Sequence, residues 1–203
     1  EAKTYIKAEV MTDRADYLNP LGNNLAYSLA VEKLCGIDVP PRAQAIRVIL
    51  AELTRINSHL VWLGTSVMDL GASSLFLYTM REREIILDIF ELVSGARMMT
   101  TYIRPGGLWR DVPVEFEDAV RRFLQLMPGR IDEYVSLIEG NELFEERTQG
   151  IGVITTEECM QYGLTGPVIR ATGLPYDLRK VRPYSGYEQY DFDIPTYPDG
   201  DVY

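Results

Sequence analysis

Apolar residues recur at alternating steps of three and four through the second quarter of the chain. This spacing places them on one side of an α-helix and makes a seam like that of a coiled coil, so the helix should pack along a neighbour for most of its length. The helix is expected to begin at Pro40-Pro41, because proline is tolerated in a first helical turn. The seam consists of Ile46, Ile49, Leu53, Ile56, Leu60, Leu63 and Val67.

A second long helix is predicted over residues 74–102, after a turn formed by Gly71 and the serines that follow it. So short a connection predicts that the two long helices pack antiparallel. The intervening stretch, residues 60–80, is apolar enough to suggest a membrane span, but Asp69 would oppose insertion. We therefore interpret this stretch as a helix end, a tight turn and a helix start.

Two further helical regions flank this pair. Asn19 as the cap and Pro20 in the first turn predict a helix that runs to Cys35 and stops at Gly36. Residues 114–139 should form another helical region, interrupted at Met127-Pro128-Gly129.

Beyond Gly140 the chain becomes rich in glycine, proline and tyrosine. Thr155 and Glu158 make a capping box for one short helix, and residues 164–203 should form loops and short strands. The predicted fold is mainly α: an antiparallel bundle of long helices over residues 1–140, with an irregular α+β extension over 141–203 packed on the same domain.

Composition limits the functions that the chain can have. The net charge of −10 argues against a nucleic-acid surface. The two cysteines, Cys35 and Cys159, form no CxxC pair and His59 is the single histidine, so neither a zinc knuckle nor a self-contained iron–sulfur site is expected. His59 lies beside the apolar seam, which favours a buried histidine bonded to a helix neighbour. The chain begins at Glu1, and we expect an internal fragment of a longer protein.

Several charged and polar positions could carry chemistry. Arg97 and Arg104 lie seven residues apart, so on one helix both would project from the same side, beside Pro105 and two glycines. Such a pattern suits an anionic partner or a redox centre, although a plain helix end with a glycine cap is the alternative. Residues 82–84 should form a solvated or interface ion-pair cluster.

A polar stripe follows the long helix opposite its seam. Its positions could face solvent or a cleft, and its low charge favours the cleft. The stripe consists of Arg55, Ser58, Trp62, Thr65 and Asp69.

The order of motifs resembles the D-type subunit of the proton-pumping NADH:quinone oxidoreductases (respiratory complex I), a family related to the large subunits of [NiFe] hydrogenases. The resemblance covers nearly the whole chain. The matching motifs are Asp16-Tyr17, AYSLAVEKL (Ala26 to Leu34), ILAELTRINSHL (Ile49 to Leu60), MDLGA (Met68 to Ala72), RERE (Arg81 to Glu84), SGAR (Ser94 to Arg97), YIRPGG (Tyr102 to Gly107), IDE (Ile131 to Glu133) and DLRK (Asp177 to Lys180).

The resemblance implies a quinone site with catalytic roles for two residues. Tyr17 would bond the quinone headgroup, and Asp69 would contact a histidine on an N-terminal loop outside this chain. Thr65 would lie on the same wall. The chain itself would bind no cofactor, since quinone is the substrate and the terminal [4Fe–4S] cluster belongs to a neighbouring subunit.

The resemblance also implies residues near the cluster and a cellular place. Arg14, Arg97 and Arg104 would lie near the cluster, as would Met99, which stands where many relatives have a histidine that couples cluster reduction to protonation. Partners would be other complex I subunits, chiefly the cluster-bearing one and the membrane subunit at the quinone chamber. The chain would sit in the peripheral arm, on the cytoplasmic or matrix side.

Two alternatives remain open at this point. A membrane-associated [NiFe] hydrogenase large subunit would need two CxxC pairs near the ends of the full protein. A purely structural bundle would explain the seam and the acidic surface, but it would leave the motifs around Tyr17 and Asp69 without a reason.

Overall fold

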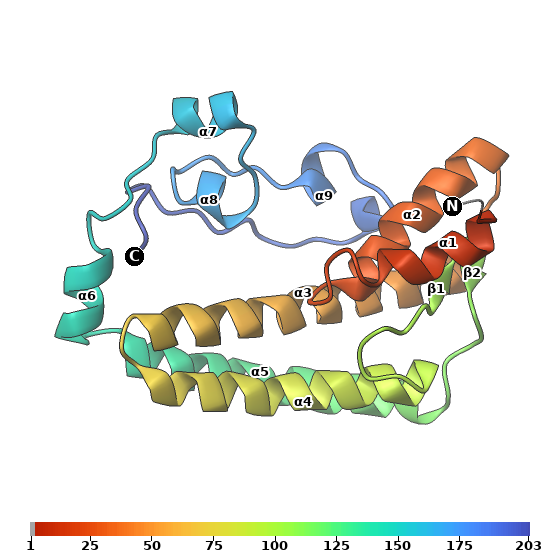
Figure 1. The fold of residues 1–203 in the computed structure, drawn as a ribbon, viewed down its shortest axis with the longest axis horizontal. Coiled ribbons are helices and arrows are strands. Elements are labelled where there is room, and N and C mark those ends of the chain that lie inside the picture. Colours follow the sequence, from red (N-terminus) through yellow and green to blue (C-terminus); the bar gives the residue numbers. More distant parts are fainter. Residues whose placement is uncertain (1–2) are drawn as a thin grey trace. The chain divides into compact units, whose positions relative to one another are not determined.

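The computed structural model describes residues 3–203, and those residues are mainly helical, as predicted (Figure 1). They divide into two compact units, one ending at Val135 and one running from Ser136 to Tyr203. The first unit contains α1 (Tyr5–Thr12), α2 (Pro20–Cys35), α3 (Pro41–Asp69), α4 (Ser73–Ser94), the two-residue strands β1 (Ile103–Arg104) and β2 (Gly107–Leu108), and most of α5 (Glu115–Ile138).

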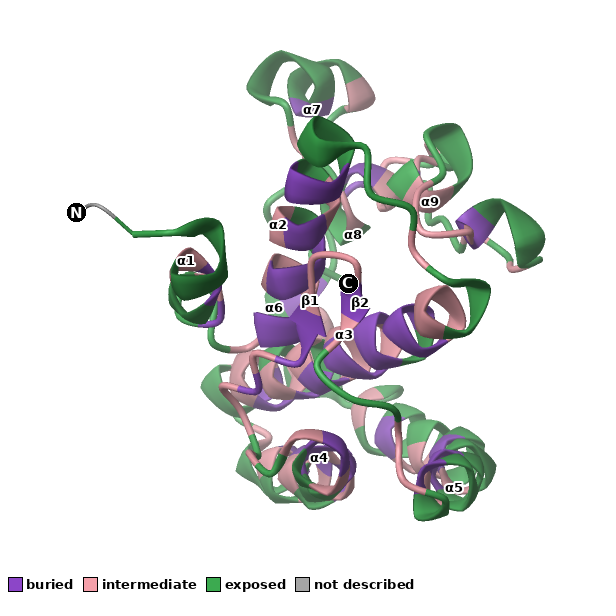
Figure 2. Cartoon of the chain, turned by 90° about the vertical axis from the view of Figure 1, so that its right-hand side faces the viewer, coloured by how far each residue is buried: buried purple, intermediate pink, exposed green. Residues whose placement is uncertain are grey.

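The long helices α3 and α4 form the antiparallel hairpin that the seam predicted (Figure 1). The stretch 60–80 is the end of α3, a tight turn and the start of α4, also as predicted. Leu53, Leu60 and Val67 of α3 are buried, together with Ile86 and Phe90 of α4. Figure 2 shows buried positions on α2, α3, α4 and the strands.

The seam is less complete than its spacing suggests. Ile49 is 37% exposed, and Ile56 and Leu63 are only half-buried. Polar Thr54 and Asn57 are buried instead. A helix of 29 residues has neighbours on more than one side, so its buried face does not follow one stripe.

The second long helix ends eight residues earlier than predicted, at Ser94. Gly95 adopts the left-handed conformation with φ 80° and closes the helix. The hydroxyl of Ser94 donates to the carbonyl of Phe90 and accepts from the backbone N–H of Ala96. The prediction that Arg97 and Arg104 share one helix is therefore wrong, and Arg104 lies on β1.

The expected interruption of α5 at Pro128 is also absent, because α5 continues from Glu115 to Ile138. A proline removes one helical hydrogen bond, from the carbonyl four residues earlier. Pro128 and Leu124 both lie on the exposed side of the helix, where water can hydrate that carbonyl.

The ion-pair cluster expected over residues 82–84 of α4, either in solvent or at an interface, is an interface cluster at Glu82. Glu82 is fully buried and accepts hydrogen bonds from Arg81 and from the hydroxyl of Tyr134 on α5. Arg130 lies 3.2 Å from the same carboxylate. This ion pair network fastens α5 to α4, because a buried carboxylate needs compensating donors.

The start and end of α2 match the prediction, with Pro20 first and Gly36 in the left-handed conformation at φ 64°. Asn19 precedes the helix but makes no side-chain capping hydrogen bond. The carboxylate of Asp16 instead accepts from the backbone N–H of Leu18, within the turn.

The second unit consists of short helices and loops. The capping box of Thr155 and Glu158 is present as predicted. Residues 164–203 form short helices where short strands were expected, and backbone bonds such as Ile154 N–H to the Gly200 carbonyl hold the last residues in place. The elements are α6 (Glu142–Thr148), α7 (Thr156–Tyr162), α8 (Pro167–Arg170), α9 (Leu178–Val181) and the 3-10 helix η1 (Tyr187–Gln189).

Candidate functional site

A buried ion pair fixes the YIRPGG motif, which forms the β1–β2 hairpin. Arg47 of α3 and Glu32 of α2 are 1% and 6% exposed and lie 2.6 Å apart. Arg47 also donates to the carbonyls of Arg104 and Gly107 at 2.6 and 3.0 Å. Glu32 accepts the backbone N–H of Gly106 at 2.8 Å. These contacts join α2, α3 and the hairpin, so the two helices fix the position of the hairpin.

The turn that carries Arg14 and Tyr17 is tied to the segment preceding this hairpin. Asp13 is fully buried and accepts from both the backbone N–H and the hydroxyl of Thr101, at 3.0 and 2.5 Å. Thr101 adopts φ 43°, which is unusual for a residue with a branched side chain. The two carboxylate contacts compensate for this conformation and hold Asp13, at the start of the turn after α1, against Thr101.

Tyr17 and Arg14 are both exposed on that turn. Tyr17 is 60% exposed, so its phenol can reach a ligand or a partner outside the chain. The guanidinium of Arg14 donates to the carbonyl of Val10 at the end of α1. A tyrosine hydroxyl can both donate and accept, and its ring can pack on an apolar ligand.

The two arginines that the sequence grouped together have separate surroundings. Arg104 donates to the carbonyl of Thr101, lies 3.8 Å from the buried carboxylate of Glu9 and stacks over the ring of Trp109. Arg97 instead pairs with Glu84 and Asp88 on α4. Met99, which lies between them in the sequence, is half-buried. Arg104 is therefore held beside Glu9 and Trp109, while the charge of Arg97 is compensated on α4.

Thr65 and Asp69 lie on the last turns of α3. The hydroxyl of Thr65 donates to its own helix, at the Val61 carbonyl, and Asp69 is exposed. At about 1.5 Å per residue, Thr65 lies roughly 27 Å along the helix axis from Arg47. Tyr17 and Asp69 come from different elements, and their shared quinone pocket stays a prediction.

His59 is exposed, so the expectation of a buried histidine is wrong. Its ring meets that of Trp62 edge-on, with 6.3 Å between centroids. The seam placed His59 next to Leu60, but one helical step turns a side chain by about 100° and so moves it off the buried face.

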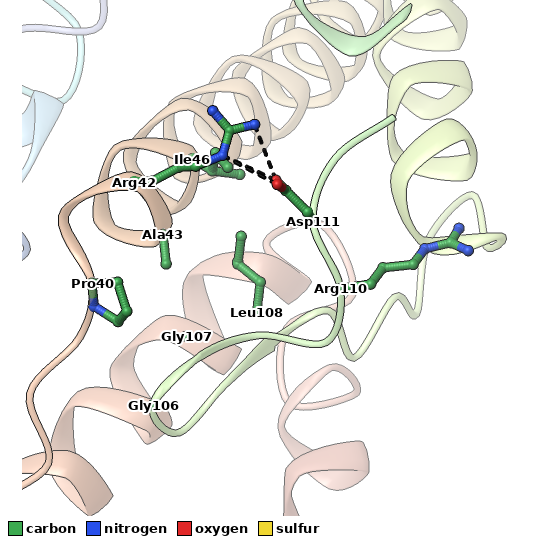
Figure 3. Close-up of a pocket in the computed structure, with 9 residues that line it drawn as sticks. All are labelled: Pro40, Arg42, Ala43, Ile46, Gly106, Gly107, Leu108, Arg110 and Asp111. Carbon is green, nitrogen blue, oxygen red and sulfur yellow. Dashed lines mark hydrogen bonds and ion pairs between the residues drawn. The ribbon is translucent and has the colours of Figure 1, made fainter. Parts of the chain in front are cut away.

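An open pocket of about 310 Å³ lies between the start of α3 and the hairpin with the residues that follow it (Figure 3). Arg42 and Asp111 point toward one another across its rim, joined at 3.1 Å, whereas Arg110 points away. The walls between them are apolar. Its apolar lining comes from Pro40, Ala43, Ile46 and Leu108.

Sequence reasoning missed the buried charges that organise this site. Glu9, Asp13, Glu32 and Arg47 looked like ordinary polar positions on helices. One signal was present, because Glu9 and Asp13 are four residues apart and so share a helical face. Arg47 also interrupts the otherwise apolar run Ile46 to Ile49.

The motifs quoted above, carried on a mainly helical fold, agree with the class of oxidoreductase subunits that the comparisons define. The family model described as "Respiratory-chain NADH dehydrogenase, 49 Kd subunit" matches residues 69–203. The chain belongs to this family.

Relatives named as D-type subunits of NADH-quinone oxidoreductase match the whole chain. The chain is 64% identical to such a relative from Roseiflexus castenholzii over 203 residues, which is 100% of this chain and 49% of the relative. It is 61% identical to a second, from Chloroflexus aurantiacus, over the same share of each. It is 54% identical to a third, from Geotalea uraniireducens, over 97% of this chain and 50% of the relative.

The chain thus spans about half the length of the curated relatives it matches. The comparisons do not favour the hydrogenase alternative, since the family model and these relatives are respiratory-chain NADH dehydrogenase subunits. Within residues 3–203 no helix is long and apolar enough to cross a bilayer. The same residues contain no cluster of three or more His, Cys, Asp or Glu side chains suited to a metal ion.

Proposed function

We propose that this chain forms part of the quinone-reducing site of a proton-pumping NADH:quinone oxidoreductase. In this role it lines the chamber where quinone accepts electrons from a [4Fe–4S] cluster that a neighbouring subunit holds. Tyr17 donates a hydrogen bond to the headgroup. Thr65 and Asp69 line the chamber, and Asp69 orients a proton donor from the part of the protein outside this chain.

The observation that carries the proposal is the pair of bonds from Asp13 to Thr101. These bonds tie the turn bearing Arg14 and Tyr17 to the segment bearing Met99 and Arg104, although more than 80 residues separate them in the sequence. A quinone that stacks near Tyr17 would therefore lie close to fixed positive charge. Positive charge near a cluster favours its reduced form and stabilises the anionic intermediates of quinone reduction.

The exposure of the proposed site residues supports a chamber completed by partners. Tyr17 is 60% exposed and Trp62, on the polar stripe of α3, is 57% exposed. Exposed aromatic side chains on a rigid helical scaffold are typical of surfaces that a partner covers. We therefore assign the cluster-bearing subunit and the membrane subunit of the complex as the partners that close the chamber, in the peripheral arm.

Tyr17→Phe in the intact complex tests this proposal. The substitution keeps the ring and removes the hydroxyl, which is the only hydrogen-bond donor of that side chain. Quinone reductase activity should therefore fall by at least about tenfold, the equivalent of one charge-assisted hydrogen bond. Reduction of the cluster by NADH, followed by EPR, should be unchanged, because the electrons reach the cluster before they reach quinone.

Tyr162→Phe is the matched control. Tyr162 is 77% exposed on α7, and the same loss of a hydroxyl there should leave both measurements unchanged. If Tyr17→Phe lowered cluster reduction and quinone reduction equally, Tyr17 would act on assembly. Full quinone reductase activity in Tyr17→Phe would refute the assignment of the phenol as the donor.

A further inference from the structure

A buried polar cluster lies where α1 and α2 meet the segment before β1. Glu9 and Asp13, one helical turn apart, are 1% and 0% exposed, and Asn24 on α2 is also fully buried. Arg104 approaches Glu9 from β1, with 3.8 Å between Nε and Oε2. Glu9 Oε1 and Asp13 Oδ1, the other oxygens of the two carboxyls, take part in none of the hydrogen bonds described above.

The cluster holds more acceptors than donors. Glu9 Oε1, Asp13 Oδ1 and Asn24 Oδ1 are buried and, among the described residues, have no hydrogen-bond partner. Thr12 gives its hydroxyl proton to the Glu9 carbonyl and accepts from the Asn24 amide nitrogen, so the oxygen of Asn24 is the buried acceptor. Three buried acceptors without a donor are costly, and the missing component is a donor.

We propose that Glu9 and Asp13 form a proton-binding site that holds one exchangeable proton at neutral pH. A proton on either carboxyl converts one acceptor into an O–H donor and removes one of two buried like charges. The remaining negative charge is balanced by Arg104. A single proton therefore reduces the number of unpaired acceptors from three to one and removes the excess charge.

The charged groups around the site determine where it titrates. Burial raises the pKa of Glu9 to about 7, against the lowering effect of Arg104, and the negative charge of Asp13 adds to the rise. Burial likewise raises the pKa of Asp13, and the hydrogen bonds from Thr101 oppose this rise. The ionisable groups that act on the pair come from α2, α3, β1 and the turn after α1, and they are Tyr27, Arg47, Arg104 and Arg14.

This site is inferred from contacts within the chain and does not rest on the proposed function. Its connection to that function is structural, because Asp13 also holds Thr101 and Glu9 faces Arg104. Loss of the proton would strengthen the attraction between Glu9 and Arg104 and change the charge beside the Tyr17 turn. The site thus places a carboxyl charge that varies with pH beside Arg104 of the hairpin.

Infrared difference spectroscopy of the intact complex tests the proposal. Spectra of the native complex minus those of Glu9→Gln, recorded at a series of pH values, should contain the C=O band of a protonated carboxyl. That band should disappear with a midpoint near pH 7, well above the ordinary carboxyl value of 4.5. Glutamine resembles the protonated form in shape and charge, so the variant should assemble. Glu117→Gln, at an exposed glutamate of α5, is the matched control and should give no such band.

A second variant tests whether the two carboxyls act as a pair. Asp13→Asn removes the like charge next to Glu9, so the midpoint should fall by about one pH unit. A carboxyl band that titrates near pH 4.5, or no band that depends on Glu9, would overturn the proposal. An unchanged midpoint in Asp13→Asn would overturn the shared site. The activity of Tyr17→Phe has no bearing on either result.

Discussion

Glu32→Gln should destabilise the first unit substantially, although the substitution removes no heavy-atom volume. Arg47 is 1% exposed, and within the described part of the chain its guanidinium has only Glu32 as a counter-charge at hydrogen-bonding distance, with contacts of 2.6 and 3.2 Å. Glutamine can still accept one of these bonds but leaves the positive charge uncompensated in the interior. Removing one partner of a buried ion pair costs about 3–5 kcal/mol.

The complementary changes refine this magnitude. Arg47→Met leaves a buried carboxylate and also strands the carbonyls of Arg104 and Gly107, so it should cost at least as much, about 5 kcal/mol. Combining Glu32→Gln with Arg47→Met removes both charges, and the double variant should be more stable than the sum of the two losses predicts, by about 1 kcal/mol or more. The double variant should still be less stable than the native protein, because the carbonyls of Arg104 and Gly107 lose their donor.

Thermal unfolding of the full-length subunit, followed by circular dichroism, measures these differences. Glu32→Gln should lower the midpoint by on the order of 5 °C or more. Arg42→Gln is the matched control. Arg42 lies on α3, as Arg47 does, and pairs with Asp111 in the segment after β2, but both side chains of this pair are exposed, at 69% and 66%. It should unfold like the native protein. Equal midpoints for Glu32→Gln and Arg42→Gln would refute the argument that the buried pair holds the hairpin.

Two further changes follow from the structure. Gly64→Ala should destabilise the α3–α4 hairpin by about 1–3 kcal/mol, because a Cβ there would overlap the buried hydroxyl of Thr79 and lie 3.3 Å from the Cα of Phe76; Gly129→Ala, on the open side of α5, should be neutral or stabilising in the same unfolding assay. Met99→His should steepen the pH dependence of the cluster's midpoint potential toward about 59 mV per pH unit, measured by EPR redox titration. A near-full slope with Met99 in place would show that another group couples the proton.

Much of the helical fold is encoded locally and could be predicted. Proline at the start and glycine at the end gave the limits of α2, and the regular seam with a short turn gave the α3–α4 hairpin. The errors arose where local signals conflict. Ala96, Arg97 and the two methionines after them favour a helix, yet Gly95 takes the left-handed conformation and ends α4. Pro128 normally interrupts a helix, yet α5 passes through it.

The candidate site was predictable only in part, because its residues depend on contacts between distant segments. Tyr17 is one of 13 tyrosines, and composition alone does not distinguish it from the others. The motif Asp16-Tyr17 identified it. Nothing in the sequence reports that Asp13, three residues before that motif, bonds to Thr101, since this pairing exists only once α1, α2 and the hairpin have packed. Buried charge looks like surface charge until its partner is known.

The same dependence explains how the hairpin holds Arg104 in a fixed position. A two-residue strand pair has too few backbone bonds to hold itself, so Arg104 takes its position from Arg47 and Glu32, on α3 and α2. Asp13 fixes the approach to the hairpin, and Glu9 faces its guanidinium. Four buried charged residues from three helices and the turn after α1 thus position one arginine. A substitution that breaks the Arg47–Glu32 pair should move Arg104, so under the proposed function its effects on stability and on quinone reduction should appear in the same variants.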